Sequence, residues 1–195
     1  MRDGIALFVL ALQLPIPVFW LLVHPAASFW RRHPRWCYYG LGSFLWGAAA
    51  GALVAGRGWW LAERFSRHWL VALAGAGLIA TDLLLTRQVE RQAGWRALVG
   101  LPELMPGQHP GRLVLEGIYQ RVRHPRYVGM MLSWWGAVLL SGATHLAGLA
   151  AAATLLIWIV SELEERELAA RFGADYVAYR ERVPRFVPRW RRDKP

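Results

Sequence analysis

The sequence predicts an all-α integral membrane protein with about five transmembrane helices, and three observations support this prediction. Hydrophobic residues make up 55% of the 195 residues and charged residues only 18%, below the roughly 25% of average globular proteins. The mean hydropathy is +0.23 although long stretches are polar, so the apolar residues must be concentrated in runs. The net charge of +10 comes almost entirely from arginine, which lies between the apolar runs and suits anionic lipid headgroups better than nucleic acid.

Five apolar runs are the predicted membrane helices. They cover approximately residues 5–23, 36–55, 69–85, 127–140 and 145–160. The first contains two prolines, which membrane helices tolerate when neighbours satisfy the freed carbonyl groups; its length and the arginines after it favour a retained helix over a signal peptide. The last two runs are shorter than the roughly 20 residues of a full span. Only residues 141–144 separate them, so they are expected to form a tight helical hairpin.

The distribution of arginine predicts the orientation of these helices. The link at residues 87–126 and the tail after residue 160 are rich in arginine, whereas the hairpin turn carries no charge. The positive-inside rule therefore places the link and the tail in the cytoplasm. The loop at residues 56–68, with Arg57 and Arg64, is the exception, because it would lie on the outer side.

Residues 117–129 form the strongest local motif, immediately before the fourth apolar run. A residue that precedes proline is pushed out of the α region, so the chain should turn at His124 and begin a helix at Pro125. Histidine, tyrosine and arginine side chains would then gather at the membrane surface. From spacing alone, two interpretations stay open: a basic membrane anchor, or a pocket for an anionic or nucleotide-like ligand.

A second motif is an acidic run directly after the fifth apolar run. Glu162 and Glu167 each have an arginine four residues later, which is the spacing of salt bridges on a helix. Glu164 and Glu165 lack such a partner, and an unpaired carboxylate beside the bilayer is a candidate for binding a cationic group. A solvated helix face is the alternative.

Three local expectations accompany these motifs. Residues 161–164 have the pattern of a capping box, which would begin a new helix, although a helix that continues from the fifth run fits equally well. Gly173 is expected to end that helix. Asp82, near the end of the third run, is expected to snorkel or to pair with Arg87. The single cysteine, Cys37, excludes intrachain disulfides and cysteine-cluster metal sites, and no histidine spacing indicates a metal site.

Together the two motifs resemble the isoprenylcysteine carboxyl methyltransferase family, in a wider group that includes phosphatidylethanolamine N-methyltransferases. Residues 117–129 follow the family pattern G-x-Y-x-x-x-R-H-P-x-Y-x-G. Residues 164–184 follow E-E-x-x-L-x-x-x-F-G-x-x-Y-x-x-Y-x-x-x-V-P. The resemblance implies a methyltransferase that uses S-adenosylmethionine at the cytoplasmic face. It divides the chain into residues 1–86, with N-terminal helices 1–3, and residues 87–195, a catalytic region made of the link, the hairpin 127–160 and the tail.

The resemblance also implies roles for individual residues. The sulfonium and ammonium groups of the cofactor suit carboxylates and aromatic faces, and its carboxylate suits Arg123 or His124. An ammonium acceptor would need a general base, for which Glu165 and His124 are candidates, whereas a carboxylate acceptor is already ionised and needs none. The implied cofactor contacts are Gly111, Arg112, Leu113, Val114, Tyr119, Arg123, His124, Pro125, Arg126, Tyr127 and Glu164.

One position departs from the family pattern. Members that modify prenylcysteine carry an arginine four residues before the cofactor-binding glutamate, where this chain has Val160. A prenylcysteine carboxylate is therefore not the expected acceptor, unless Arg166 or Arg185 replaces the missing anchor. Trp134 and Val160 are expected to line an apolar acceptor site with Arg185 nearby. The expected partners are a lipophilic small molecule or lipid and membrane lipids, and the acceptor atom and oligomeric state stay open.

Two other functions remain compatible with the sequence. The first is a non-catalytic membrane protein that keeps the fold as a binding or scaffold module. The second is an enzyme of the sterol-reductase type, which would use NADPH instead of S-adenosylmethionine. Cofactor binding distinguishes the three hypotheses.

Overall fold

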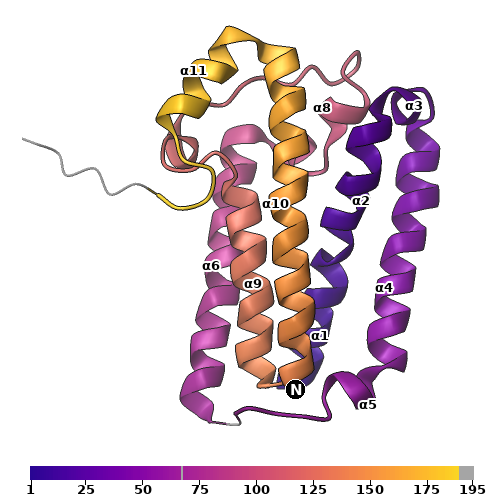
Figure 1. Ribbon diagram of the computed structural model, residues 1–195, viewed down its shortest axis with the longest axis vertical. Coiled ribbons are helices and arrows are strands. Elements are labelled where there is room, and N and C mark those ends of the chain that lie inside the picture. The colour runs from indigo at the N-terminus through magenta and orange to yellow at the C-terminus, as the bar shows by residue number, and fades with distance from the viewer. Residues whose placement is uncertain (67, 189–195) are drawn as a thin grey trace, which may run out of the picture.

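The computed structural model describes residues 1–66 and 68–188, and this part of the chain is helical with connecting loops and no β-strand (Figure 1). The helical elements are α1 (Arg2–Gln13), α2 (Pro15–Val23), η1 (His24–Ala26), α3 (Ala27–Arg32), η2 (Trp36–Gly42), α4 (Ser43–Ala55), α5 (Arg57–Trp60), α6 (Trp69–Ala93), α7 (Trp95–Leu98), α8 (Leu101–Leu104), η3 (Gly117–Gln120), α9 (Pro125–Ser141), α10 (Thr144–Phe172) and α11 (Ala174–Arg182). The predicted all-α class is confirmed.

Four helical stretches of the described chain are long and apolar enough to cross a membrane. They are Arg2–Arg32, Trp36–Ala55, Trp69–Ala93 and Thr144–Phe172. Helix α9 runs alongside them (Figure 1) but has 17 residues, fewer than the roughly 20 that a full span needs. The integral membrane class is thus supported, and a fifth span at α9 stays a prediction.

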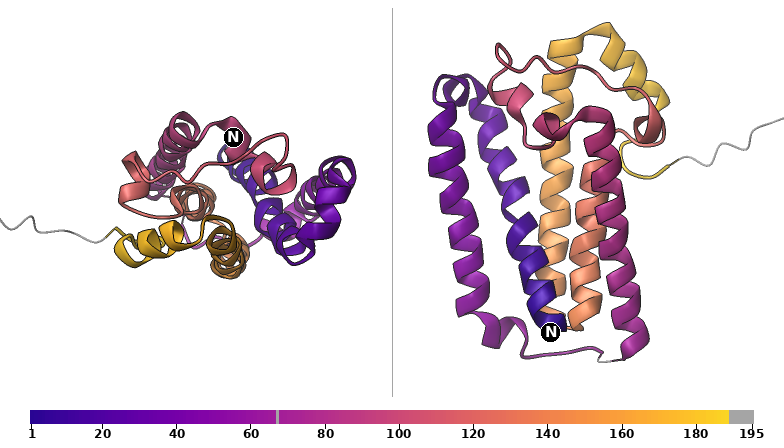
Figure 2. Two further views of the ribbon diagram at one scale, coloured as in Figure 1. Left: turned by 90° about the horizontal axis from the view of Figure 1, so that it is seen from above. Right: turned by 180° about the vertical axis from the view of Figure 1, so that it is seen from behind.

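The bundle has two different ends. The N-terminus, α5 and the turn between α9 and α10 lie at one end, whereas α3, α8 and α11 lie at the other (Figures 1 and 2). We call the second the α11 end. The link and the tail, which carry many of the arginines, meet there.

Helices α6 and α9 pack closely through glycine. A Cβ atom at Gly75 would lie 2.5 Å from the carbonyl oxygen of Gly136, and one at Gly136 would lie 2.7 Å from the carbonyl oxygen of Gly75. Small residues permit this approach between membrane helices, where packing replaces the hydrophobic driving force of water. The pair forms one wall of the bundle.

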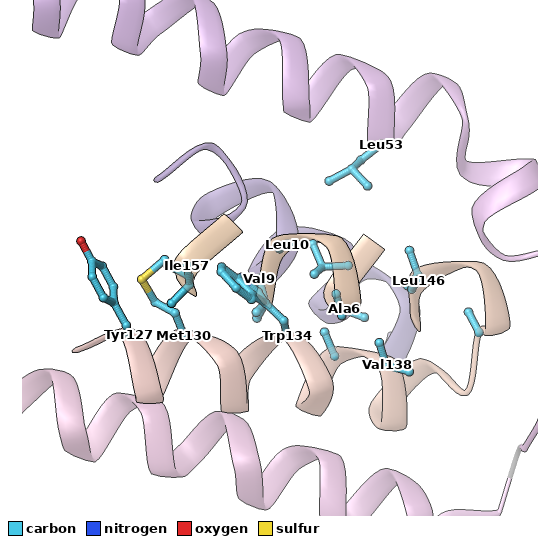
Figure 3. Close-up of a cluster of buried hydrophobic side chains, with 14 of the residues drawn as sticks. Ala6, Val9, Leu10, Leu53, Tyr127, Met130, Trp134, Val138, Leu146 and Ile157 are labelled. Carbon is cyan, nitrogen blue, oxygen red and sulfur yellow. The ribbon is translucent and has the colours of Figure 1, made fainter. Parts of the chain in front are cut away.

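The core lies between α1, α9 and α10 (Figure 3), where Leu10, Met130, Trp134, Ile157 and Val160 are fully buried. Val160 and Trp134 therefore belong to the packed core of the described chain. The expectation that they line an acceptor site stays a prediction.

The structure settles the three local expectations. Helix α10 continues through residues 161–164, so the capping-box pattern does not begin a helix there, and α10 ends before Gly173, whose φ of 57° suits glycine. Asp82 does not pair with Arg87. Its carboxylate is buried and accepts hydrogen bonds from Nη1 of Arg126 at 3.0 Å and from Nε2 of Gln13 at 2.6 Å.

Candidate functional site

A cavity of about 590 Å³ lies at the α11 end of the bundle. Its volume falls in the range of small-molecule sites, roughly 300–1,000 Å³. Its walls come from both halves of the chain. The lining residues are Ile16, Phe19, Trp20, His24, Tyr38, Gly42, Ser43, Trp46, Val89, Ala97, Leu98, Val99, Gly100, Glu103, Tyr119, Arg123, His124, Pro125, Arg126, Tyr127, Met130 and Glu164.

Two carboxylates face this cavity without complete hydrogen bonding. Oε2 of Glu103 and Oε2 of Glu164 are each buried and have no hydrogen-bond partner among residues 1–66 and 68–188; we call such an atom open. Burial, and secondly the charge of Glu164, raise the pKa of Glu103 to about 7. An open buried carboxylate oxygen is costly, so the pair is prepared to receive a cation or a proton donor.

Aromatic rings surround the two carboxylates. Trp20, Tyr38, Tyr119 and Tyr127 line the same cavity. Burial, with a smaller contribution from the charge of Glu164, raises the pKa of Tyr119, so its phenol stays protonated. Aromatic faces and carboxylates are the groups that bind sulfonium and ammonium cations.

The two arginines that line the cavity are already paired. Arg123 donates to Glu165, and Arg126 donates to Asp82. In the described part of the chain Glu103 forms no ion pair and Glu164 has only a 3.6 Å contact with His124, so these two carboxylates are the least neutralised charges of the lining.

Glu165 is the centre of an ion cluster that closes the α11 end, which we call the Glu165 clamp. Its Oε1 accepts from Nη2 of Arg123 at 2.7 Å, from Nε2 of His124 at 3.0 Å and from Nε of Arg185 at 2.9 Å, and its Oε2 accepts from Nη2 of Arg185 at 2.9 Å. Its side chain is 1% exposed. The expectation that Glu165 lacks a partner is wrong, because its partners come from outside its own helix.

The Glu165 clamp fixes the chain on both sides of the hairpin. The backbone N–H groups of Arg123 and His124 donate to the carbonyl groups of Pro184 and Arg185 at 2.9 and 3.2 Å. The start of α9 is thereby tied to the segment after α11. Arg185 belongs to this clamp and to an ion pair with Glu162 at 2.6 Å, and its role toward a substrate stays a prediction.

His124 has both ring nitrogens against carboxylates. Its Nε2 lies 3.0 Å from Oε1 of Glu165 and its Nδ1 lies 3.6 Å from Oε2 of Glu164. Its ring stacks on Tyr127 with centroids 5.4 Å apart. The structure thus brings together the implied contacts Tyr119, Arg123, His124, Pro125, Arg126, Tyr127 and Glu164.

The implied contacts at residues 111–114 lie elsewhere. Gly111, Arg112, Leu113 and Val114 are not among the described residues that line the cavity. A Cβ atom at Gly111 would collide with the guanidinium of Arg171, and Nη2 of Arg112 donates to the carbonyl group of Gln92 at 2.7 Å. This loop therefore anchors the link to neighbouring segments.

Sequence reasoning missed Glu103 and His24. Glu103 lies in the short helix α8, in a Leu-Pro-Glu-Leu stretch without a pattern that indicates a site. His24 is followed by Pro25, and the same dipeptide occurs at His124 and Pro125. That repetition was a usable signal.

The fold and the cavity define an integral membrane protein of α-helices with a cavity, lined by carboxylates and aromatic rings, at one end of its bundle. The sequence allows a more specific statement. The chain belongs to the phospholipid methyltransferase family, whose profile matches residues 70–175. The matched region contains Glu103, Glu164 and most of the Glu165 clamp. Arg185, the remaining member of the clamp, lies beyond its end.

Curated relatives include enzymes for different acceptors. Methanethiol S-methyltransferase 2 of Bradyrhizobium diazoefficiens is 42% identical over 72 residues, which are 37% of this chain and 27% of that protein. Methanethiol S-methyltransferase of Crocosphaera subtropica is 33% identical over 125 residues, 64% of this chain and 44% of that protein. Protein-S-isoprenylcysteine O-methyltransferase B of Arabidopsis thaliana is 30% identical over 124 residues, 63% of this chain and 61% of that protein.

This chain thus covers less than half of the length of either methanethiol S-methyltransferase. No solved structure gives a significant match.

Proposed function

We propose that this protein transfers a methyl group from S-adenosylmethionine to a small lipophilic acceptor inside the cavity. The observation that carries the proposal is the pair of open oxygens on Glu103 and Glu164 in a cavity lined with aromatic rings. S-adenosylmethionine fits these groups because it has two cationic groups, and membership of a methyltransferase family calls for a methyl donor.

The residues of the cavity would divide the work as follows. Glu164 and Glu103 bind positive charge, and the rings of Trp20, Tyr119 and Tyr127 bind the cation by their faces and exclude water. When bound, the cofactor supplies a methyl group on a positively charged sulfur. The protein contributes mainly by aligning the acceptor with that methyl group. The Glu165 clamp positions these cavity residues. Because the carboxylate of Glu165 is already paired, Glu165 is not the general base in this proposal.

The charge of the cavity bears on the acceptor. A carboxylate acceptor, such as prenylcysteine, would meet Glu103 and Glu164 without an open arginine in the lining, and Val160 is buried in the core. A thiol or an amine avoids this repulsion, and two of the relatives above are named for methanethiol. The phosphates of NADPH carry more negative charge than the single carboxylate of S-adenosylmethionine, so Glu103 and Glu164 disfavour NADPH more strongly than the proposed cofactor.

Calorimetry with S-adenosylmethionine tests the proposal. Glu164→Gln removes a charge-assisted contact worth about 1.5–3 kcal/mol, so binding should weaken by about 10- to 150-fold. Glu90→Gln is the matched control, because Glu90 is an exposed carboxylate on α6 outside the cavity lining. Absence of binding by the unaltered protein at millimolar S-adenosylmethionine contradicts the proposal.

We further infer that the α11 end faces the cytoplasm, since the arginine-rich link and tail meet there. Exposed positions at the two ends allow a test in a Cys37→Ser background. Thr144→Cys should react with a membrane-impermeant thiol reagent from outside, and Glu181→Cys only from the cytoplasmic side. The reverse labelling pattern refutes this orientation.

A further inference from the structure

A second histidine, His24 from the N-terminal half of the chain, lines the cavity and pairs with Glu167 of α10. Nδ1 of His24 lies 2.9 Å from Oε2 of Glu167. The His24 side chain is 4% exposed, and its other ring nitrogen, Nε2, is open in the sense defined above.

Three elements hold this pair in place. His24 begins η1, where Pro25 follows it, and its ring stacks on Trp20 with centroids 5.1 Å apart. Glu167 lies on α10, one turn beyond Glu164 and thus on a similar side of the helix. Arg31 on α3 donates to the other oxygen of Glu167. The carboxylate is therefore fixed by two partners, and neither is Arg171, the partner expected from helix spacing.

The contact with Glu167 defines the protonation of the neutral ring. An ionised carboxylate only accepts hydrogen bonds. In the neutral ring Nδ1 therefore carries the hydrogen and donates a hydrogen bond to Glu167. Nε2 then has a free lone pair. A base whose second nitrogen is oriented by a carboxylate is the arrangement by which proteins activate a nucleophile.

We propose that His24, oriented by Glu167, is the catalytic base that removes the proton from a thiol acceptor in this cavity. The inference rests on the proposed function and deepens it by assigning the acceptor class. A neutral thiol meets no charge repulsion from Glu103 and Glu164, and it becomes a thiolate nucleophile only when a base removes its proton. His124 is less suited to this role, because both of its nitrogens already face carboxylates.

The step conserves atoms and charge. The S–H bond of the acceptor breaks, its proton moves to Nε2 of His24, and the electron pair stays on the acceptor sulfur. That pair forms the new bond to the methyl carbon of the sulfonium donor, while the old carbon–sulfur bond gives its electrons to the donor sulfur. The products are a methyl thioether, a neutral donor thioether and an imidazolium, which returns its proton to water.

Two acceptors separate proton removal from the other roles of His24. An aliphatic thiol such as hexanethiol is protonated at neutral pH and needs the base, whereas 4-nitrothiophenol is already a thiolate. His24→Asn should lower the rate with hexanethiol by about 100- to 10,000-fold and the rate with 4-nitrothiophenol by less than about 10-fold. His33→Asn is the matched control, because His33 is exposed, its ring hydrogen-bonds to the carbonyl oxygen of Phe29, and it does not line the cavity.

Equal losses with both acceptors, or no loss, would overturn the assignment of His24. If the unaltered protein binds S-adenosylmethionine but methylates neither thiol, the thiol assignment is wrong and the proposed cofactor stands. If it does not bind S-adenosylmethionine, the proposed function itself fails.

A measurement without turnover tests the orientation of the ring. In protein labelled with ¹⁵N at histidine, the imidazole signals that His24→Asn removes should show a protonated Nδ1 and an unprotonated Nε2. Glu167→Gln should weaken this preference, and the His33→Asn control should leave these signals unchanged. A neutral ring protonated at Nε2 would contradict the role of His24 as a base toward the cavity.

Discussion

The chain places a His-Pro dipeptide at two helix boundaries, and the two histidines approach the same cavity from opposite halves of the sequence. Each contacts a glutamate of α10: His24 contacts Glu167, and His124 contacts Glu165. The surroundings of the second ring nitrogen differ between the two histidines. In His124 it lies 3.6 Å from Glu164, whereas in His24 it is open.

This difference suggests a structural role for His124 and a chemical role for His24. His124 is enclosed by carboxylates and belongs to the Glu165 clamp, so its contacts hold the start of α9. His24 leaves one nitrogen directed to no protein partner in the described chain, which is what a proton acceptor requires. The same dipeptide thus serves two purposes because the surrounding charges differ.

The largest loss of stability should come from a substitution of Glu165, the partner of His124. Glu165→Gln removes the buried charge that partners Arg123 and Arg185, and breaking a buried ion pair costs about 3–5 kcal/mol. The melting temperature in detergent should fall by about 6–20 °C.

The matched substitution on the other side is Glu167→Gln. Its arginine partner is 39% exposed, and the amide oxygen of glutamine can still accept the hydrogen bond from Nδ1 of His24. The loss in stability should therefore be below about 1 kcal/mol. Similar melting temperatures for the two variants would show that the Glu165 clamp is not the stronger of the two pairs.

A smaller effect, on the pH dependence of stability and binding, should come from Glu103, which lies outside the sequence motifs. The raised pKa of Glu103, about 7, means that folding disfavours its charged form, so its contribution to stability is present below about pH 4.5 and is lost as the pH rises through about 7. Binding of a cation has the opposite dependence, because the ionised carboxylate attracts it.

Affinity for S-adenosylmethionine should therefore increase between pH 6 and 8, and Glu103→Gln should weaken binding by about 10-fold at pH 8 and flatten the profile. Calorimetry across this range measures both. An unchanged profile in Glu103→Gln would exclude Glu103 from the binding of positive charge.

The smallest effect should distinguish the two prolines. Pro125 is buried at the first turn of α9, whereas Pro25 is exposed in η1. Pro125→Ala should cost about 1 kcal/mol, because it frees the unfolded chain and loses packing, and Pro25→Ala should change stability by less than about 0.5 kcal/mol. Thermal unfolding of the two variants provides the comparison, and a larger loss for Pro25→Ala would contradict it.

Local patterns predicted much of the fold. Apolar runs located the helices, and the Pro125 and Gly173 signals located the start of α9 and the end of α10. The motif at residues 117–129 and Glu164 also pointed to residues that line the cavity.

Long-range partners could not be predicted in this way. Helix spacing considers neighbours three or four residues away, but the partners of Glu165 and Glu167 come from other elements, as does Arg126, the partner of Asp82. Val160 is predicted to lie in an acceptor site because it takes the position of the family's arginine, but an apolar residue such as Val160 or Trp134 fits the core equally well. Only the packing of α1 against α9 and α10 decides between these alternatives.

The Glu165 clamp also has a consequence for the order in which the molecule is made. Its partners lie 42, 41 and 20 residues away in the sequence, and contacts between distant residues form late because closing long loops costs entropy. A nascent chain that ends before Arg185 can build its helices but cannot complete the clamp. The cavity end of the bundle should therefore mature last, after the helical hairpin is already in the membrane.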